Sequence, residues 1–165
     1  MTPFAWLLGL LLPACAASGA NGVPPPPDLL HLARPGTPNT SLAAPAGFMP
    51  DSGPAPDITT HPYAVPPAEL IADLKGVADQ QIRVYARPSP AGQPDRTDWV
   101  ARSRVFNFPD LVSAQALPRP GGGALLILYS ASVYGEGDFR VNRGRVKTWL
   151  AALDRALGTT NAADR

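Results

Sequence analysis

The sequence has 165 residues, 16% of them charged, and a formal net charge of +1. This length fits one compact domain, and so small a net charge gives no electrostatic basis for binding a nucleic acid. Proline is unevenly placed, since 15 of the 21 prolines lie at or before Pro67. The composition therefore separates a proline-rich N-terminal part from a more regular C-terminal part.

The N-terminus is apolar, and no charged side chain occurs before Asp28. The apolar run over residues 3–14 has about 12 residues, whereas a bilayer span needs about 20. It fits the central region of a secretory signal, so residues 1–14 are interpreted as a signal peptide. The ending Leu12-Pro13-Ala14-Cys15 resembles a bacterial lipobox, in which cleavage precedes the cysteine and a diacylglycerol is attached to its thiol.

Cys15 is therefore the predicted lipidation site, and it has no disulfide partner because it is the only cysteine. Acyl chains on this residue would anchor the protein in a membrane. Ala16 follows the cysteine where an aspartate would retain a lipoprotein in the inner membrane, which points to the periplasmic face of the outer membrane. Three alternatives stay open: cleavage near Ala17 that releases a soluble periplasmic or secreted protein, an uncleaved anchor, or a misplaced start.

Four segments are expected after the signal. Residues 15–27 are small, uncharged and end in four prolines, which predicts a lipid-anchored tether. Residues 28–65 carry many turn signals and a few leucines, and they are interpreted as an irregular strap laid over the domain. The globular domain is expected over residues 66–158, and residues 159–165 are expected to form a disordered tail.

Within the domain, the pattern predicts a helix, four strands and a second helix. Pro66-Pro67 begins a helix whose apolar residues keep helical spacing to about Asp79. Apolar or alternating stretches then predict strands at residues 81–86, 99–106, 111–117 and 124–133. Asp138 suits the N-cap of a helix from about Phe139 to Leu157. Short connections imply an α+β fold: a four-stranded antiparallel meander with both helices on one face.

One stretch resembles the signature of the domain of unknown function 1499 family. Residues 130–146 are similar to its pattern Ser-x-Ser-Arg-x-Gly-x-Ser-Asp-x-Gly-Val-Asn-Arg-x-Arg-Val. Val133, Gly137 and Arg140 depart from it, where the family has an arginine, a serine and a glycine. These departures leave Asn142 in place but remove an arginine that would suit an anionic ligand.

Two earlier stretches add to this resemblance. Residues 102–110 are similar to the family's Arg-Ser-x-x-Phe-x-Phe-x-Asp segment, and Pro38-Asn39 is similar to its Pro-Asn element. The family occurs in bacterial envelopes and in plastids. The resemblance implies no activity.

The candidate site is a polar cluster made of Ser132, Asp138, Asn142, Arg143 and Arg145. Asn142 lies on the apolar face of the last helix, and a buried amide without partners costs about 1–3 kcal/mol. It is expected to hold backbone groups of the loop at residues 135–137 or of the strap, or else to face a ligand between helix and sheet. Asp138 is interpreted as a helix cap rather than a catalytic acid.

Arg140, Arg143 and Lys147 share one face of the same helix. They would suit phosphate head groups or peptidoglycan acids, or they form a solvated helix face. The only histidines, His31 and His61, lie in the strap, so no serine has an evident base. The sequence has no metal-ligand spacing and no cofactor motif.

The sequence therefore predicts a non-enzymatic binding or structural module of the cell envelope. Its partner would be an envelope protein or a cell-wall component, besides the membrane itself. The alternative is a small-molecule binder or enzyme that uses the cleft around Asp138, Asn142 and Arg143.

Overall fold

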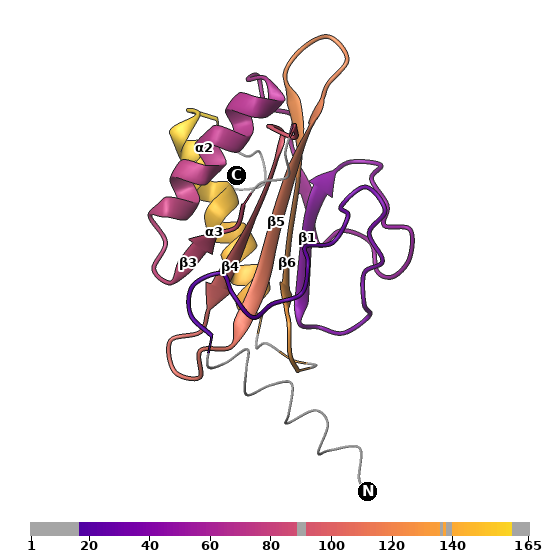
Figure 1. The fold of residues 1–165 in the computed structure, drawn as a ribbon. Helices are drawn as coiled ribbons and strands as arrows, with labels where there is room; N and C mark the ends of the chain where they lie inside the picture. Colours follow the sequence, from indigo (N-terminus) through magenta and orange to yellow (C-terminus); the bar gives the residue numbers. More distant parts are fainter. Residues whose placement is uncertain (1–16, 89–91, 136, 138–139, 160–165) are drawn as a thin grey trace, which may run out of the picture.

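The fold is built on a six-stranded sheet with the strand order β2-β1-β6-β5-β4-β3 (Figure 1). The structure is a computed structural model that describes residues 17–88, 92–135, 137 and 140–159. The strands are β1 (Thr40–Pro45), β2 (Ile58–Thr60), β3 (Val84–Ala86), β4 (Arg96–Arg102), β5 (Pro109–Pro118) and β6 (Ala124–Ser132). The pair of β1 and β2 is parallel and the other four pairs are antiparallel, so the sheet is mixed.

The predicted four-stranded meander is therefore too small. The strands from β3 to β6 do follow one another as an antiparallel meander, but β1 pairs with the free edge of β6 and extends the sheet. Both β1 and β2 lie in residues 28–65, so the prediction of an irregular strap is wrong for these strands. Their short runs of small residues carry little periodicity, and their pairing is with chain far along the sequence.

Two helices of the described residues, α2 (Pro67–Asp79) and α3 (Val141–Ala156), cover one face of the sheet (Figure 1). Trp99 of β4 and Trp149 of α3 meet edge to face in this core, with ring centroids 5.1 Å apart. Neither helix in the described ranges combines the length and the apolar character needed to cross a membrane.

The opposite face of the sheet is covered by the chain that precedes β1. Leu29 and Leu32 are fully buried there and form a second apolar core with residues of β1 and β6. Figure 1 shows this indigo and purple segment crossing the sheet before it enters β1. The sheet is thus covered on both faces, by helices on one and by proline-rich chain on the other.

Residues 17–27 were expected to be part of a free tether, but they are bonded to the domain. Arg102 of β4 donates to the carbonyls of Gly19 and Asn21, and Arg96 of the same strand donates to the carbonyl of Pro27. The composition of this segment is that of a linker. Arg96 and Arg102 lie 69 to 83 residues further along the chain than the carbonyls they bind, which is why composition alone did not reveal these contacts.

The start of α3 differs from the sequence-based expectation. The helix begins at Val141, preceded by Arg140 in a left-handed conformation with φ of 65°. A residue with a side chain pays about 1–2 kcal/mol for this conformation, whereas glycine adopts it freely. The signature that this stretch resembles has glycine at this position, a residue that would adopt the conformation without that cost. The expected cap Asp138 lies outside the described residues, as do the predicted signal peptide, Cys15 and residues 160–165.

Candidate functional site

A hydrogen-bonded network joins α3 to the sheet and to the chain before β1. At its centre Asn142, on the first turn of α3, is fully buried. Its amide nitrogen donates to the carbonyl of Asn39 at 2.9 Å and to the hydroxyl of Ser132 at 3.0 Å. Its amide oxygen accepts from the hydroxyl of Ser130 and, at 2.7 Å, from Arg145. These four bonds use both donors and both acceptor positions of the side-chain amide.

Arg145 extends the network to β5. Its guanidinium donates to the hydroxyl of Ser130 and to the carboxylate of Asp110, both at 2.8 Å. The two charged side chains are only 14% and 11% exposed, so removing either would leave its partner as a poorly solvated charge. The side chain of Asn39 also donates to the carbonyl of Gly135. We refer to this group as the Asn142 network; its members are Asn39, Asp110, Ser130, Ser132, Asn142 and Arg145.

The predicted candidate residues are divided between two places. Ser132, Asn142 and Arg145 belong to the Asn142 network, whereas Arg143 is exposed on another side of α3 and Asp138 lies outside the described residues. Asn142 makes the kind of contact that its structural interpretation expects, since its amide donates to the carbonyl of Asn39 in the segment before β1.

Asn39, Asp110 and Ser130 were not predicted as members of the site. All three lie in the stretches that carry the family resemblance, so the signal for them was present in the sequence. What the sequence did not show is that these stretches converge on one side chain.

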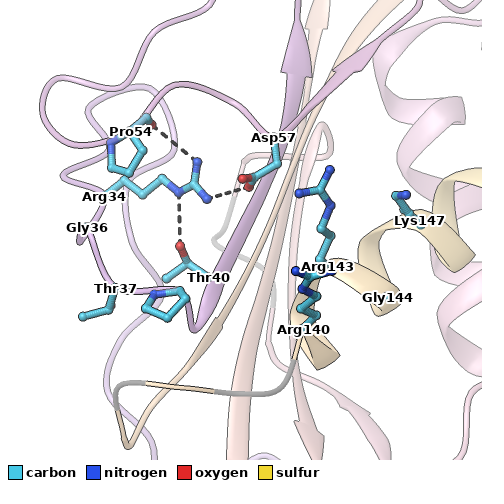
Figure 2. Close-up of a pocket in the computed structure, with 11 residues that line it drawn as sticks. Arg34, Gly36, Thr37, Thr40, Pro54, Asp57, Arg140, Arg143, Gly144 and Lys147 are labelled. Atoms are coloured by element: carbon cyan, nitrogen blue, oxygen red, sulfur yellow. Dashed lines mark hydrogen bonds and ion pairs between the residues drawn. The ribbon is translucent and has the colours of Figure 1, made fainter.

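Beside this network lies a hollow of about 620 Å³ between α3 and the chain around β1 (Figure 2). Four basic side chains and one acidic side chain contribute to its lining: Arg34, Arg140, Arg143, Lys147 and Asp57. We refer to it as the cationic hollow. It combines the basic helix face expected from the sequence with a second wall that the sequence did not predict.

The second wall is held by an ion pair whose arginine is buried. Nη2 of Arg34 lies 2.5 Å from Oδ2 of Asp57, and the Arg34 side chain is only 4% exposed. Arg34 also donates to the hydroxyl of Thr40 and to the carbonyl of Ala55, while Asp57 accepts from the backbone amide of Leu42. Figure 2 shows this group facing the basic side chains of α3. The wall is therefore rigid and nearly neutral.

The helix wall carries net positive charge. Arg143 and Lys147 are exposed, and neither has a hydrogen-bond or ion-pair partner within the described ranges. They stand four residues apart on one face of α3, where like charges repel each other. A bound anion would relieve that repulsion.

A histidine–carboxylate pair lies at the other end of α3. Nε2 of His61 is 3.5 Å from Oδ1 of Asp154, and the hydroxyl of Tyr63 donates to the same oxygen at 3.1 Å. Burial, and then the nearby Asp154, raise the pKa of Tyr63, so its hydroxyl stays protonated at neutral pH. These contacts were not predicted, because they join distant parts of the chain: 91 residues separate Tyr63 from Asp154. They tie the chain after β2 to α3.

Among the described residues, no three His, Cys, Asp or Glu side chains are grouped so that they would hold a metal ion. The fold and these contacts define a small α+β domain whose polar signature residues bond chiefly to one another. A family model described as protein of unknown function (DUF1499) matches residues 32–153, and the chain belongs to this family. Comparison with curated proteins and with solved structures gave no significant match.

We predict that Asn142→Ala lowers the free energy of unfolding by about 2–4 kcal/mol, because it removes four hydrogen bonds of a fully buried amide, to the carbonyl of Asn39 and to the side chains of Ser130, Ser132 and Arg145. Arg143→Ala, one residue along and exposed, should change it by less than about 0.5 kcal/mol. Urea denaturation followed by circular dichroism measures both. A similar small change in the two variants would contradict a structural role for the network.

Proposed function

We propose that this protein is an exported lipoprotein that acts as a non-enzymatic binding module of the bacterial cell envelope. In this proposal Cys15 carries the lipid that anchors the chain at the periplasmic face of the outer membrane. The cationic hollow binds an anionic group of an envelope component. The observation that carries the binding role is the pair Arg143 and Lys147, which has no acidic partner within the described residues and faces a rigid wall.

The hollow suits an anion for two reasons. A guanidinium such as that of Arg143 binds a phosphate or a carboxylate through two parallel hydrogen bonds, and Lys147 adds a second positive charge one turn along the helix. The opposite wall is already fixed by the ion pair of Arg34 and Asp57, so little ordering is needed on binding. Phosphate head groups and peptidoglycan carboxylates both fit this chemistry.

The contacts of the network support a non-enzymatic role. A serine nucleophile needs a positioned base. The hydroxyl of Ser130 is engaged by Asn142 and Arg145, and that of Ser132 by Asn142. None of the described contacts of the network involves an imidazole. These serines act as hydrogen-bonding members of the structure.

A small anionic molecule is the alternative ligand. The hollow's volume of about 620 Å³ falls within the range of about 300–1,000 Å³ that is common for small-molecule sites. This alternative also uses Arg143, but it does not use Asn142, which is buried and fully bonded.

The lipid anchor predicts a simple labelling result. In cells grown with an alkyne-bearing palmitate analogue, the wild-type protein should carry the label and the Cys15→Ser variant should not, because the chain has no other cysteine. In-gel fluorescence after coupling to a dye reads out the label. Equal labelling of both proteins, or of neither, would refute the anchor.

If the cationic hollow binds the anion, the positions of its basic side chains decide the strength of binding, and the net charge of the protein does not. Unlipidated Cys15→Ser protein is tested for sedimentation with purified peptidoglycan and with vesicles that contain phosphatidylglycerol. Arg143→Glu/Lys147→Glu should weaken binding to one of these about tenfold or more, since two favourable charges become repulsive.

The matched control for this measurement is Lys75→Glu/Arg155→Glu, which changes the net charge equally at two positions outside the hollow. It should bind as the unmodified protein does. Equal loss in both double variants would show that only net charge matters. If the Cys15→Ser protein without further substitutions binds neither peptidoglycan nor the vesicles, the envelope ligand is refuted. The small-molecule alternative is then favoured.

A further inference from the structure

We propose that the domain rests on the lipid bilayer through an apolar surface at the end of the sheet where the described chain begins. The surface, named the membrane face, consists of Ile82, Val105, Phe106, Phe108 and Val141. The inference rests on the lipid anchor of the proposed function and adds to it the orientation of the domain on the membrane.

The first observation is the exposure of these side chains. Ile82 and Val105 are 82% and 81% exposed, and Phe106 is 68% exposed. Eight large apolar side chains are exposed among the described residues, and five of them belong to the membrane face: the others are Leu30, Met49 and Tyr85. Such a concentration at one end marks an interaction surface rather than scattered exposure.

The members of this face are brought together by the loop between β4 and β5. The rings of Phe106 and Phe108 contact each other within this loop, with centroids 5.6 Å apart. Arg83, next to Ile82, donates to the side chain of Asn107 in the same loop. Ile82 and Val141 line one shallow hollow. Figure 1 shows the β4–β5 loop at the lower end of the sheet, opposite the β5–β6 hairpin.

The second observation is where the chain enters the domain. The side-chain amide of Asn107 donates to the carbonyl of Ala17 at 3.1 Å, and Arg102 donates to the carbonyls of Gly19 and Asn21 at 2.8 and 2.6 Å. The start of the described chain is thus bonded to the loop that carries Val105 and Phe106.

These contacts limit the distance between the β4–β5 loop and the bilayer surface. Cys15 precedes Ala17 by two residues, which span at most about 7 Å at about 3.6 Å per residue. A lipid attached to Cys15 therefore brings the bilayer surface close to the β4–β5 loop. A free tether over residues 15–27 would have left the orientation undetermined, and the bonds to Ala17 and Gly19 remove that freedom.

The chemistry of the loop suits a lipid–water boundary. Phenylalanine and valine enter the region between head groups and acyl chains, while a basic side chain beside them meets the lipid phosphates. Arg104 is exposed next to Val105 and has no partner within the described residues. The bilayer covers these apolar side chains without any further partner.

The test uses the full lipidated protein in vesicles of phosphatidylethanolamine and phosphatidylglycerol that contain a nitroxide-labelled lipid as quencher. Acylation consumes the thiol of Cys15, so a cysteine introduced by Val105→Cys carries the only bimane fluorophore. The control is Arg119→Cys, which places the same probe on the exposed β5–β6 hairpin. The ten residues of β5 separate the two positions by about 30 Å.

The probe at position 105 should lose about half of its emission, because a side chain buried about 5–10 Å into the head-group boundary meets the quencher. The probe at position 119 should be nearly unaffected. If the protein floats with the vesicles but the two probes are quenched alike, the membrane face is refuted and the lipid anchor stands. If the protein does not float with the vesicles, both are refuted.

A measurement without lipid tests whether something other than the bilayer covers the membrane face. The variant Cys15→Ser/Val105→Cys, labelled and dissolved without lipid, should emit as a water-exposed bimane. Blue-shifted emission would show that a second copy of the chain or its own N-terminal segment covers the loop, and it would overturn the membrane face.

Discussion

A buried side-chain amide must find partners for two N–H groups and one carbonyl oxygen, and for Asn142 these partners come from separate parts of the chain. Asn39 precedes β1, Ser130 and Ser132 lie at the end of β6, and Arg145 lies on α3 itself. One side chain therefore aligns the helix, the sheet and the N-terminal chain. A shift of any of these would leave a buried polar group unpaired.

The other features depend on this alignment. With the carbonyl of Asn39 fixed, β1 pairs with β6, and the preceding chain lies on the face of the sheet opposite the helices. That placement sets Arg34 across from Arg143, which creates the cationic hollow. It also brings the start of the described chain beside the β4–β5 loop, where the exposed apolar side chains lie. Both proposed binding surfaces thus follow from the path of residues 17–60.

The sequence allowed the regular half of the fold to be predicted. Helical spacing located α2 and most of α3, and alternation located the meander from β3 to β6, although β4 lies about three residues earlier than expected. β1 and β2 were missed because they are short and pair through contacts far along the chain. In β1, Leu42 pairs with Tyr129, and such a contact leaves no local periodicity.

The candidate site, like the fold, was predictable only where a local sequence pattern pointed to it. Asn142 stood out as a polar residue on an apolar helix face, and its role as a structural hydrogen-bonding group follows from the cost of burial. Its partners did not stand out, since Asn39 lies 103 residues away. Arg143 and Lys147 were visible as a basic helix face, but the wall built by Arg34 and Asp57 was not, because it belongs to chain without regular periodicity.

The central claim is that the N-terminal chain, the sheet and α3 form one cooperative unit joined at Asn142. Native-state hydrogen exchange tests it through three amides: that of Leu42, bonded to Asp57; that of Ser132, bonded to Asn39; and that of Ala116 in β5. We expect all three amides to exchange only by global unfolding, with the same free energy of opening. Exchange of the Leu42 and Ser132 amides through a smaller opening, while the Ala116 amide stays protected, would contradict it.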